Sequence, residues 1–89
     1  MQFPADVTKD VTNRLSRAEG QLRGIQRLIE DGADCRDVVT QLAATQAALH
    51  RVGLRLMAAG MRHCLMEPES QEAEGFSVDE MEALFLKLR

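Results

Sequence analysis

The feature that most constrains the fold is a proline-free run from Cys35 to about Met66, which lies between Asp34 and Pro68. Asp34 is a good N-cap for a helix, and Pro68 would end one. At 1.5 Å per residue, such a helix is roughly 45–50 Å long. A chain of 89 residues cannot cover a rod of that length by itself. The run therefore predicts one long helix, 34–66, that packs against helices of another copy.

A shorter helix is predicted before the long one, over residues 8–31, after a loose arm at 1–7. Its apolar positions recur every three or four residues, which places them on one face of a helix. Gly32 follows as a left-handed C-terminal stop. The apolar stripe consists of Val11, Leu15, Ala18, Leu22, Ile25 and Ile29.

A third helix is predicted over residues 77–88, after an acidic linker at 67–76, because Ser77 and Glu80 have the spacing of a capping box. The apolar content of 45%, with three Phe and neither Trp nor Tyr, predicts an aliphatic core of closely packed helices. The expected fold class is all-α, with three helices in a single domain, 1–89. Its long antiparallel hairpin would pair with a second copy in a dimeric four-helix bundle.

The net charge of −3 is unevenly distributed, which leaves room for a basic surface. Residues 9–62 hold nine Lys or Arg and six Asp or Glu, a balance of +3, whereas residues 63–89 hold two and seven, a balance of −5. The sequence shows neither a secretory signal nor an apolar run of transmembrane length. We therefore expect a cytoplasmic protein without membrane association, in which cysteines sense or bind rather than form structural disulfides.

The two cysteines, Cys35 and Cys64, are 29 residues apart on the long helix. At about 100° per residue they fall on almost the same face, but they lie roughly 43 Å apart along the axis. A disulfide needs Cα atoms within about 7 Å of each other. An antiparallel pair of long helices would bring Cys35 opposite Cys64 of the partner subunit. Another subunit arrangement would not, and two structural thiols are the alternative.

The positions of the thiols on the helix also differ electrostatically. Cys35 lies in the first turn, where unpaired N–H groups and the positive end of the helix dipole favour a thiolate. Cys64 lies near the opposite end, where the dipole disfavours one. Arg36 adds positive charge beside Cys35 while Asp34 and Asp37 oppose it, so the sequence leaves the net pKa of Cys35 open. The asymmetry of the dipole alone suggests Cys35 as the attacking thiol and Cys64 as the resolving thiol.

The segment RLSRAEGQLRGIQRLIEDGADCRDVVTQLAATQAAL closely resembles the copper-sensing-operon repressor (CsoR/RcnR) family, which includes copper, nickel/cobalt, formaldehyde and persulfide sensors. The similarity runs from about Val11 to Leu65. It implies an all-helical homotetramer, a dimer of antiparallel hairpin dimers, that binds operator DNA without a helix-turn-helix motif. Binding of an inducer at the dimer interface would release the DNA, so the chain is not expected to be an enzyme.

The resemblance also gives the thiols a role. Copper-sensing members carry a Cys on the second helix, and a His and a Cys four residues apart on the other protomer. Cys35 and Cys64 match the cysteines, but the histidine position falls on Gly60, which offers no ligand. The chain therefore resembles the persulfide-sensing (CstR-like) branch, which implies no cofactor and a di- or polysulfide bridge between protomers, formed by persulfide or polysulfide. The alternative is a Cu(I) sensor with Cys35 and Cys64 as thiolate ligands and His63 as a further candidate.

A basic surface is predicted from two stripes of side chains. Arg14, Arg17 and Gln21 share one face of the first helix, and Arg51, Arg55 and Arg62 lie within about 40° of each other on the second. The resemblance implies that Arg14 and Arg51 contact operator DNA, with Arg17, Gln21 and Arg55 as further candidates. Four copies of these stripes would contact phosphates and read DNA shape. An ordinary solvated face is the alternative.

Two other classes of function stay open at this point. A thiol-based enzyme, such as a small peroxidase or a sulfur carrier, would need an acid–base partner for its cysteine, and no such constellation is identifiable in the sequence. A plain helical assembly module would bind no DNA in a salt-dependent manner, and it would be indifferent to the loss of both thiols.

Overall fold

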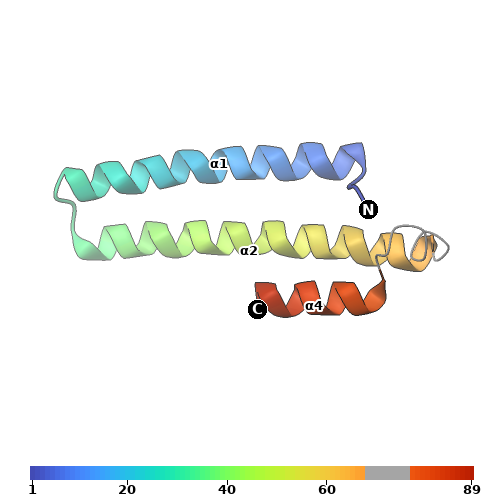
Figure 1. Cartoon of the computed structure of the whole chain (residues 1–89). Coiled ribbons are helices and arrows are strands. Elements are labelled where there is room, and N and C mark those ends of the chain that lie inside the picture. The colour runs from blue at the N-terminus through green and yellow to red at the C-terminus, as the bar shows by residue number, and fades with distance from the viewer. Residues whose placement is uncertain (68–76) are drawn as a thin grey trace.

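The computed structural model describes residues 1–67 and 77–89, which form three helices and no strand. Helices α1 (Ala5–Glu30) and α2 (Cys35–Met66) lie side by side as an antiparallel hairpin, and α4 (Val78–Leu88) packs against α2 on the side away from α1 (Figure 1). The all-α prediction with a long hairpin is confirmed. Most of the linker predicted at 67–76 lies outside the described residues.

The ends of α2 follow the local signals of the sequence. The Asp34 carboxylate accepts a hydrogen bond of 2.8 Å from the backbone N–H of Arg36 and so caps the first turn of α2. Gly32 has φ of +74°, and the N–H of Ala33 donates to the carbonyl of Leu28 at 2.9 Å. This left-handed residue ends α1 and allows the sharp reversal into α2.

The beginning of α1 differs from the prediction by three residues, because the helix begins at Ala5 rather than at residue 8. Pro4 stands in the N-cap position, where its lack of an N–H has no cost and its φ of −58° suits the helix. The extra turn places Val7 against α2, where it is buried together with Val11. Packing on α2 therefore begins α1 earlier than the local sequence indicates.

The core of the single chain is thin, in a molecule with extents of 55 × 25 × 15 Å. Its main cluster joins the start of α1 to the second half of α2 and consists of Val7, Val11, Val52 and Ala59, with Leu56 packed against them. Helix α4 covers another face of this half of α2. Its Leu88 lies so close to Gly53 that a Cβ at that position would be 3.2 Å from the leucine methyl carbons.

One side of the hairpin is apolar and uncovered. In α1 the predicted stripe is divided, since Val11, Ala18 and Ile25 are buried whereas the alternate members are 39–60% exposed. At 100° per residue, the exposed members of α1 and the exposed apolar residues in the first half of α2 lie on the same side of the hairpin. They are Leu15, Leu22, Ile29, Val39, Leu42 and Leu49.

The face of α2 that carries both thiols is covered over only part of its length. Its first half, with Val39 and Leu49, is exposed as the predicted pairing with a second copy needs. Its second half, with Gly53 and Gly60, is buried and faces α4 instead. A partner α2 would therefore meet an edge of α4 as well as α2. Among the described helices, none combines the length and the apolarity that crossing a bilayer demands.

Two glycine substitutions should have opposite effects on stability. Gly32→Ala is expected to lower the free energy of unfolding by about 1 kcal/mol, because an L side chain is strained at positive φ. Gly20→Ala, in α1 with nothing within 4 Å of the added Cβ, should raise it by about 0.5–1 kcal/mol. Urea denaturation at one fixed protein concentration measures both, and equal signs would contradict this account of the turn.

Candidate functional site

The two thiols lie at opposite ends of α2. Cys35 is the first residue of the helix and is exposed, whereas Cys64 lies in its last turn and is only 1% exposed. They are not joined to each other within the chain. Their separation along the helix, about 43 Å at 1.5 Å per residue, excludes any pairing inside one protomer. A site that uses both sulfur atoms has to be built from two chains.

An apolar hollow lies beside Gly60, one turn before Cys64. Its volume is about 430 Å³, and it is bounded by the N-terminal arm, α2 and α4. The lining residues are Met1, Phe3, Leu56, Met57, Gly60, Met81, Leu84, Lys87 and Leu88. This hollow is not predictable from the sequence, because the periodicity of α4 shows that the helix has an apolar face but not which face of α2 it packs against.

The histidine nearest to Cys64 in sequence points to another side of α2. His63 Nδ1 lies 3.3 Å from Glu67 Oε2, and the histidine lines a separate hollow with Asp6 and Arg62 near the start of α1. Residues 63 and 64 differ by about 100° around the helix, which explains the divergence. Within the described part of the chain, no three His, Cys, Asp or Glu side chains gather as a metal site would require.

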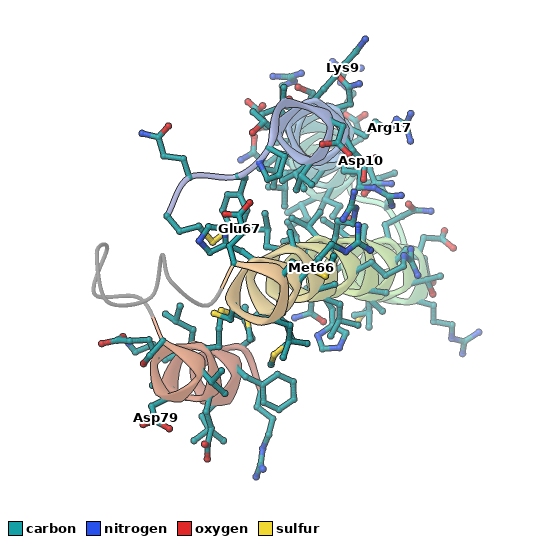
Figure 2. All side chains as sticks on the ribbon, turned by 90° about the vertical axis from the view of Figure 1, so that its right-hand side faces the viewer. Lys9, Asp10, Arg17, Met66, Glu67 and Asp79 are labelled. Carbon is teal, nitrogen blue, oxygen red and sulfur yellow. The ribbon has the colours of Figure 1, made fainter. Side chains whose placement is uncertain are left out.

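The structure brings together four of the five side chains predicted to contact DNA. Arg14, Arg17 and Gln21 from α1 and Arg51 from α2 line one shallow hollow of about 190 Å³ between the helices. Figure 2 shows Arg17 and Asp10 on the side of the hairpin that faces away from α4. By helical phase, this basic side of the hairpin lies opposite the uncovered apolar side. Each side can therefore bind a different partner at the same time.

The fifth side chain, Arg55, is tied to this surface by a carboxylate. Asp10 Oδ1 accepts a hydrogen bond from Arg14 Nε at 3.1 Å, and its Oδ2 accepts one from Arg55 Nε at 3.4 Å. The Asp10 carboxylate therefore joins an arginine of α1 to an arginine of α2. The hydrogen bond from Arg14, followed by the charges of both guanidinium groups, holds the pKa of Asp10 below its ordinary value of 3.8. Asp10 was not among the predicted site residues, although its spacing of four residues from Arg14 is that of an ion pair on a helix.

Comparison with known proteins decides the family. The sequence profile described as "Metal-sensitive transcriptional repressor" matches residues 7–87. The chain belongs to this family. The copper-sensing transcriptional repressor CsoR of Bacillus subtilis is 44% identical over 57 residues, which is 64% of this chain and 56% of that protein. The copper-sensing transcriptional repressor RicR of Mycobacterium tuberculosis is 42% identical over 62 residues, which is 70% of this chain and 65% of that protein.

A solved structure of a family member supports the same assignment. The copper-sensing repressor CsoR with Cu(I) from Geobacillus thermodenitrificans matches with a TM-score of 0.82 and 30% identity, over 98% of this chain and 91% of that chain. The chain spans less than two thirds of the length of each of the two CsoR-family relatives compared above. The family membership is thus established over nearly the whole chain.

One prediction from the sequence is wrong. The absence of a histidine at Gly60 led to the expectation that this CsoR-family member has no cofactor, but its relatives are named copper-sensing and the solved neighbour holds Cu(I). The physical reason is that the soft Cu(I) ion selects thiolate and thioether sulfur. The loss of one imidazole therefore does not by itself remove affinity for Cu(I).

Asp10→Asn in this CsoR-family chain should reveal the ion pairs through their pH dependence. Because the pKa of Asp10 is lowered in the folded state, its contribution to stability is present above about pH 4 and is lost as the pH falls through the lowered value. The unfolding temperature of wild type should exceed that of the variant at pH 7 by a small margin, as for an exposed pair. Thermal unfolding at pH 7 and pH 2 tests this, and an unchanged difference at pH 2 would refute it.

Proposed function

We propose that this chain is a Cu(I)-responsive transcriptional repressor, in which Cys35 of one protomer and Cys64 of the partner subunit together hold the ion. The observation that carries the proposal is the placement of the only two thiols at opposite ends of one helix, in a chain similar to a Cu(I)-bound repressor over nearly its whole length. Antiparallel pairing of two α2 helices would give two identical thiol pairs per dimer.

The chemistry of the two donors fits this ion. Thiolates are soft ligands that favour Cu(I) over harder divalent ions, and both thiols must lose a proton to act as ligands. Cys35 is accessible at the first residue of α2, and Cys64 provides a buried, water-poor position. The bound ion would join the α2 helices of two protomers at each end.

The effect of Cu(I) on DNA binding follows from the placement of the arginines and the thiols on the hairpin. Arg14, Arg17, Gln21, Arg51 and Arg55 are proposed to contact the phosphates of operator DNA, as a surface that four protomers repeat in a tetramer. Since Arg51 and Arg55 lie on the same helix as both thiols, a cross-link that displaces α2 would displace these arginines too. Cu(I) releases the DNA if the cross-linked arrangement binds DNA less well than the open one.

Gly60 favours a second candidate function, persulfide sensing. With no imidazole at this position, the Cys35 thiolate could take the outer sulfur of a persulfide, RS–SH, and release the thiol RSH. The Cys64 thiolate of the partner subunit would then attack the Cys35 sulfur, form a disulfide and release HS⁻. A further sulfur transfer before this step would give a trisulfide.

A titration separates the two functions. The fully reduced protein, bound without oxygen to a DNA duplex selected from a random-sequence library for binding to it, is mixed with Cu(I) from a weak chelator or with inorganic polysulfide. Copper sensing predicts release at about one Cu(I) per protomer and an unchanged protein mass after the metal is removed. Release by polysulfide alone, with covalently linked protomers in mass spectra, would instead support the second function. Release by neither would overturn both.

A further inference from the structure

We propose that the Met81 thioether is the third Cu(I) ligand of this protein, in the place that a histidine side chain leaves vacant at Gly60. The proposal rests on the proposed copper function and deepens it. It assigns to α4 a direct part in the site, in addition to covering α2. It also gives the chain a donor set of two thiolates and one thioether.

The first support is the crowding of thioethers at this end of the molecule. The chain has five methionines, and three of them, Met1, Met57 and Met81, line the hollow that contains Gly60. Met57 and Met81 also line a neighbouring hollow together with Met61. Among the residues that the structure describes, the remainder of the lining around Gly60 is apolar apart from Lys87. Sulfur is therefore the available soft donor beside the last turns of α2.

The second support is the direction of the side chains. Helix α4 runs antiparallel to α2 (Figure 1), so its first residues lie beside the end of α2 that carries Cys64. Helical side chains lean toward the N-terminus of their own helix. The Met81 side chain therefore leans toward the level of Cys64, whereas the Met57 side chain, on α2 itself, leans away from it. This difference favours Met81 over Met57.

The third support is burial. Met81 and Cys64 are among the three largest side chains that the fold buries almost completely, at 2% and 1% exposure. A ligand in this position is already ordered and dehydrated before the ion arrives, which reduces the entropy cost of binding. Gly60 is buried on the same face of α2, one turn from Cys64, and its lack of a side chain leaves the space that an imidazole would take.

The charges of the assembled site are consistent with a neutral third donor. Two thiolates and one Cu(I) carry a net charge of −1, and a thioether adds none and gives up no proton. Lys87, which is among the described residues that line the hollow, provides a compensating positive group. A carboxylate as third ligand would instead raise the buried negative charge, which is costly in apolar surroundings.

Selenium provides a direct test in the unaltered fold. The full-length protein is produced with selenomethionine, loaded with one Cu(I) per protomer, and measured by X-ray absorption at the copper and selenium edges. The proposal expects Cu–Se scattering together with two Cu–S neighbours. Copper bound at this stoichiometry without Cu–Se scattering would overturn the Met81 ligand and leave the copper function intact. Failure of the wild type to bind Cu(I) would overturn the proposed function itself.

Three leucine variants identify the methionine. Met81→Leu nearly preserves the buried volume and is expected to abolish Cu–Se scattering and to weaken Cu(I) binding about tenfold in chelator competition. Met57→Leu, in the same hollow, and Met66→Leu, which is 75% exposed at the end of α2, are the matched controls and should retain both. Persistent Cu–Se scattering in Met81→Leu, or its loss in Met57→Leu alone, would overturn the assignment.

Discussion

Cys35→Ser is expected to leave the protein bound to its operator at Cu(I) concentrations that release the wild type. A serine hydroxyl is a hard donor that stays protonated, so Cu(I) affinity should fall by about 100-fold or more. Because Cys35 is exposed, the free energy of unfolding should change by less than about 0.5 kcal/mol. Chelator competition and fluorescence anisotropy with labelled DNA measure the two effects. DNA release with wild-type copper dependence would contradict the site.

A mixture of two inactive variants provides a sharper control. Cys35→Ser and Cys64→Ala protomers should each fail alone. A mixed antiparallel dimer, however, keeps one complete pair, which is Cys35 of one subunit with Cys64 of the partner subunit. After random exchange of subunits, about a quarter of the wild-type copper sites should return, since half of the dimers are mixed and each has one of two sites. No recovery would exclude pairing between protomers. Alanine is preferred at position 64, because a serine hydroxyl buried there would add a cost of its own.

Arg51→Ala is expected to weaken operator binding and to reduce its salt dependence. Arg51 lines the hollow between α1 and α2 with Arg14 and Arg17, where a phosphate would meet guanidinium groups of both helices. Loss of one phosphate contact lowers the slope of log K against log salt by about 0.9, and the reduction grows with the number of protomers that contact the DNA. Titrations at several salt concentrations measure the slope, and Cu(I) affinity should be unchanged.

Arg23→Ala is the matched control for the basic surface. Arg23 is nine residues from Arg14 on α1, which places it half a turn away around the helix, on the side opposite Arg14. Its removal lowers the total positive charge by the same amount as Arg51→Ala does. An equal loss of DNA affinity in both variants would show that net charge, rather than this particular surface, determines binding.

Much of the fold follows from short-range signals, whereas the arrangement of the third helix does not. Asp34 and Gly32 fix the boundary between α1 and α2 because a cap and a left-handed turn act within a few residues. The N-terminal turn of α1 was missed because it forms by packing of Val7 on α2. Likewise, Leu88 covers Gly53 through a contact between residues distant in sequence, and no periodicity indicates that pairing.

The features of the candidate site also fall into two groups, those that could be predicted from the sequence and those that could not. The phases of Cys35 and Cys64, and of the arginine stripes, follow from helix geometry and were predictable residue by residue. The position of His63 beside Glu67, the two hydrogen bonds of Asp10 and the methionines around Gly60 depend on neighbours across the fold. The expectation of no cofactor was wrong for the same reason. It was based on the missing imidazole at Gly60, whereas the methionine sulfur that α4 places near Gly60 depends on the packing of distant residues.

The length of α2 has a consequence for cooperativity between the two ends of a dimer. The two proposed sites would lie about 43 Å apart, which is several times the screening distance of about 8 Å at physiological ionic strength. The charge of an ion at one end is therefore almost completely screened at the other end. Yet each α2 supplies a thiol to both ends, so the first ion to bind positions half of the ligands for the second. Any coupling between the two ends must therefore be mechanical, through displacement of the stiff α2 helix. We expect the cooperativity of Cu(I) binding to be insensitive to salt.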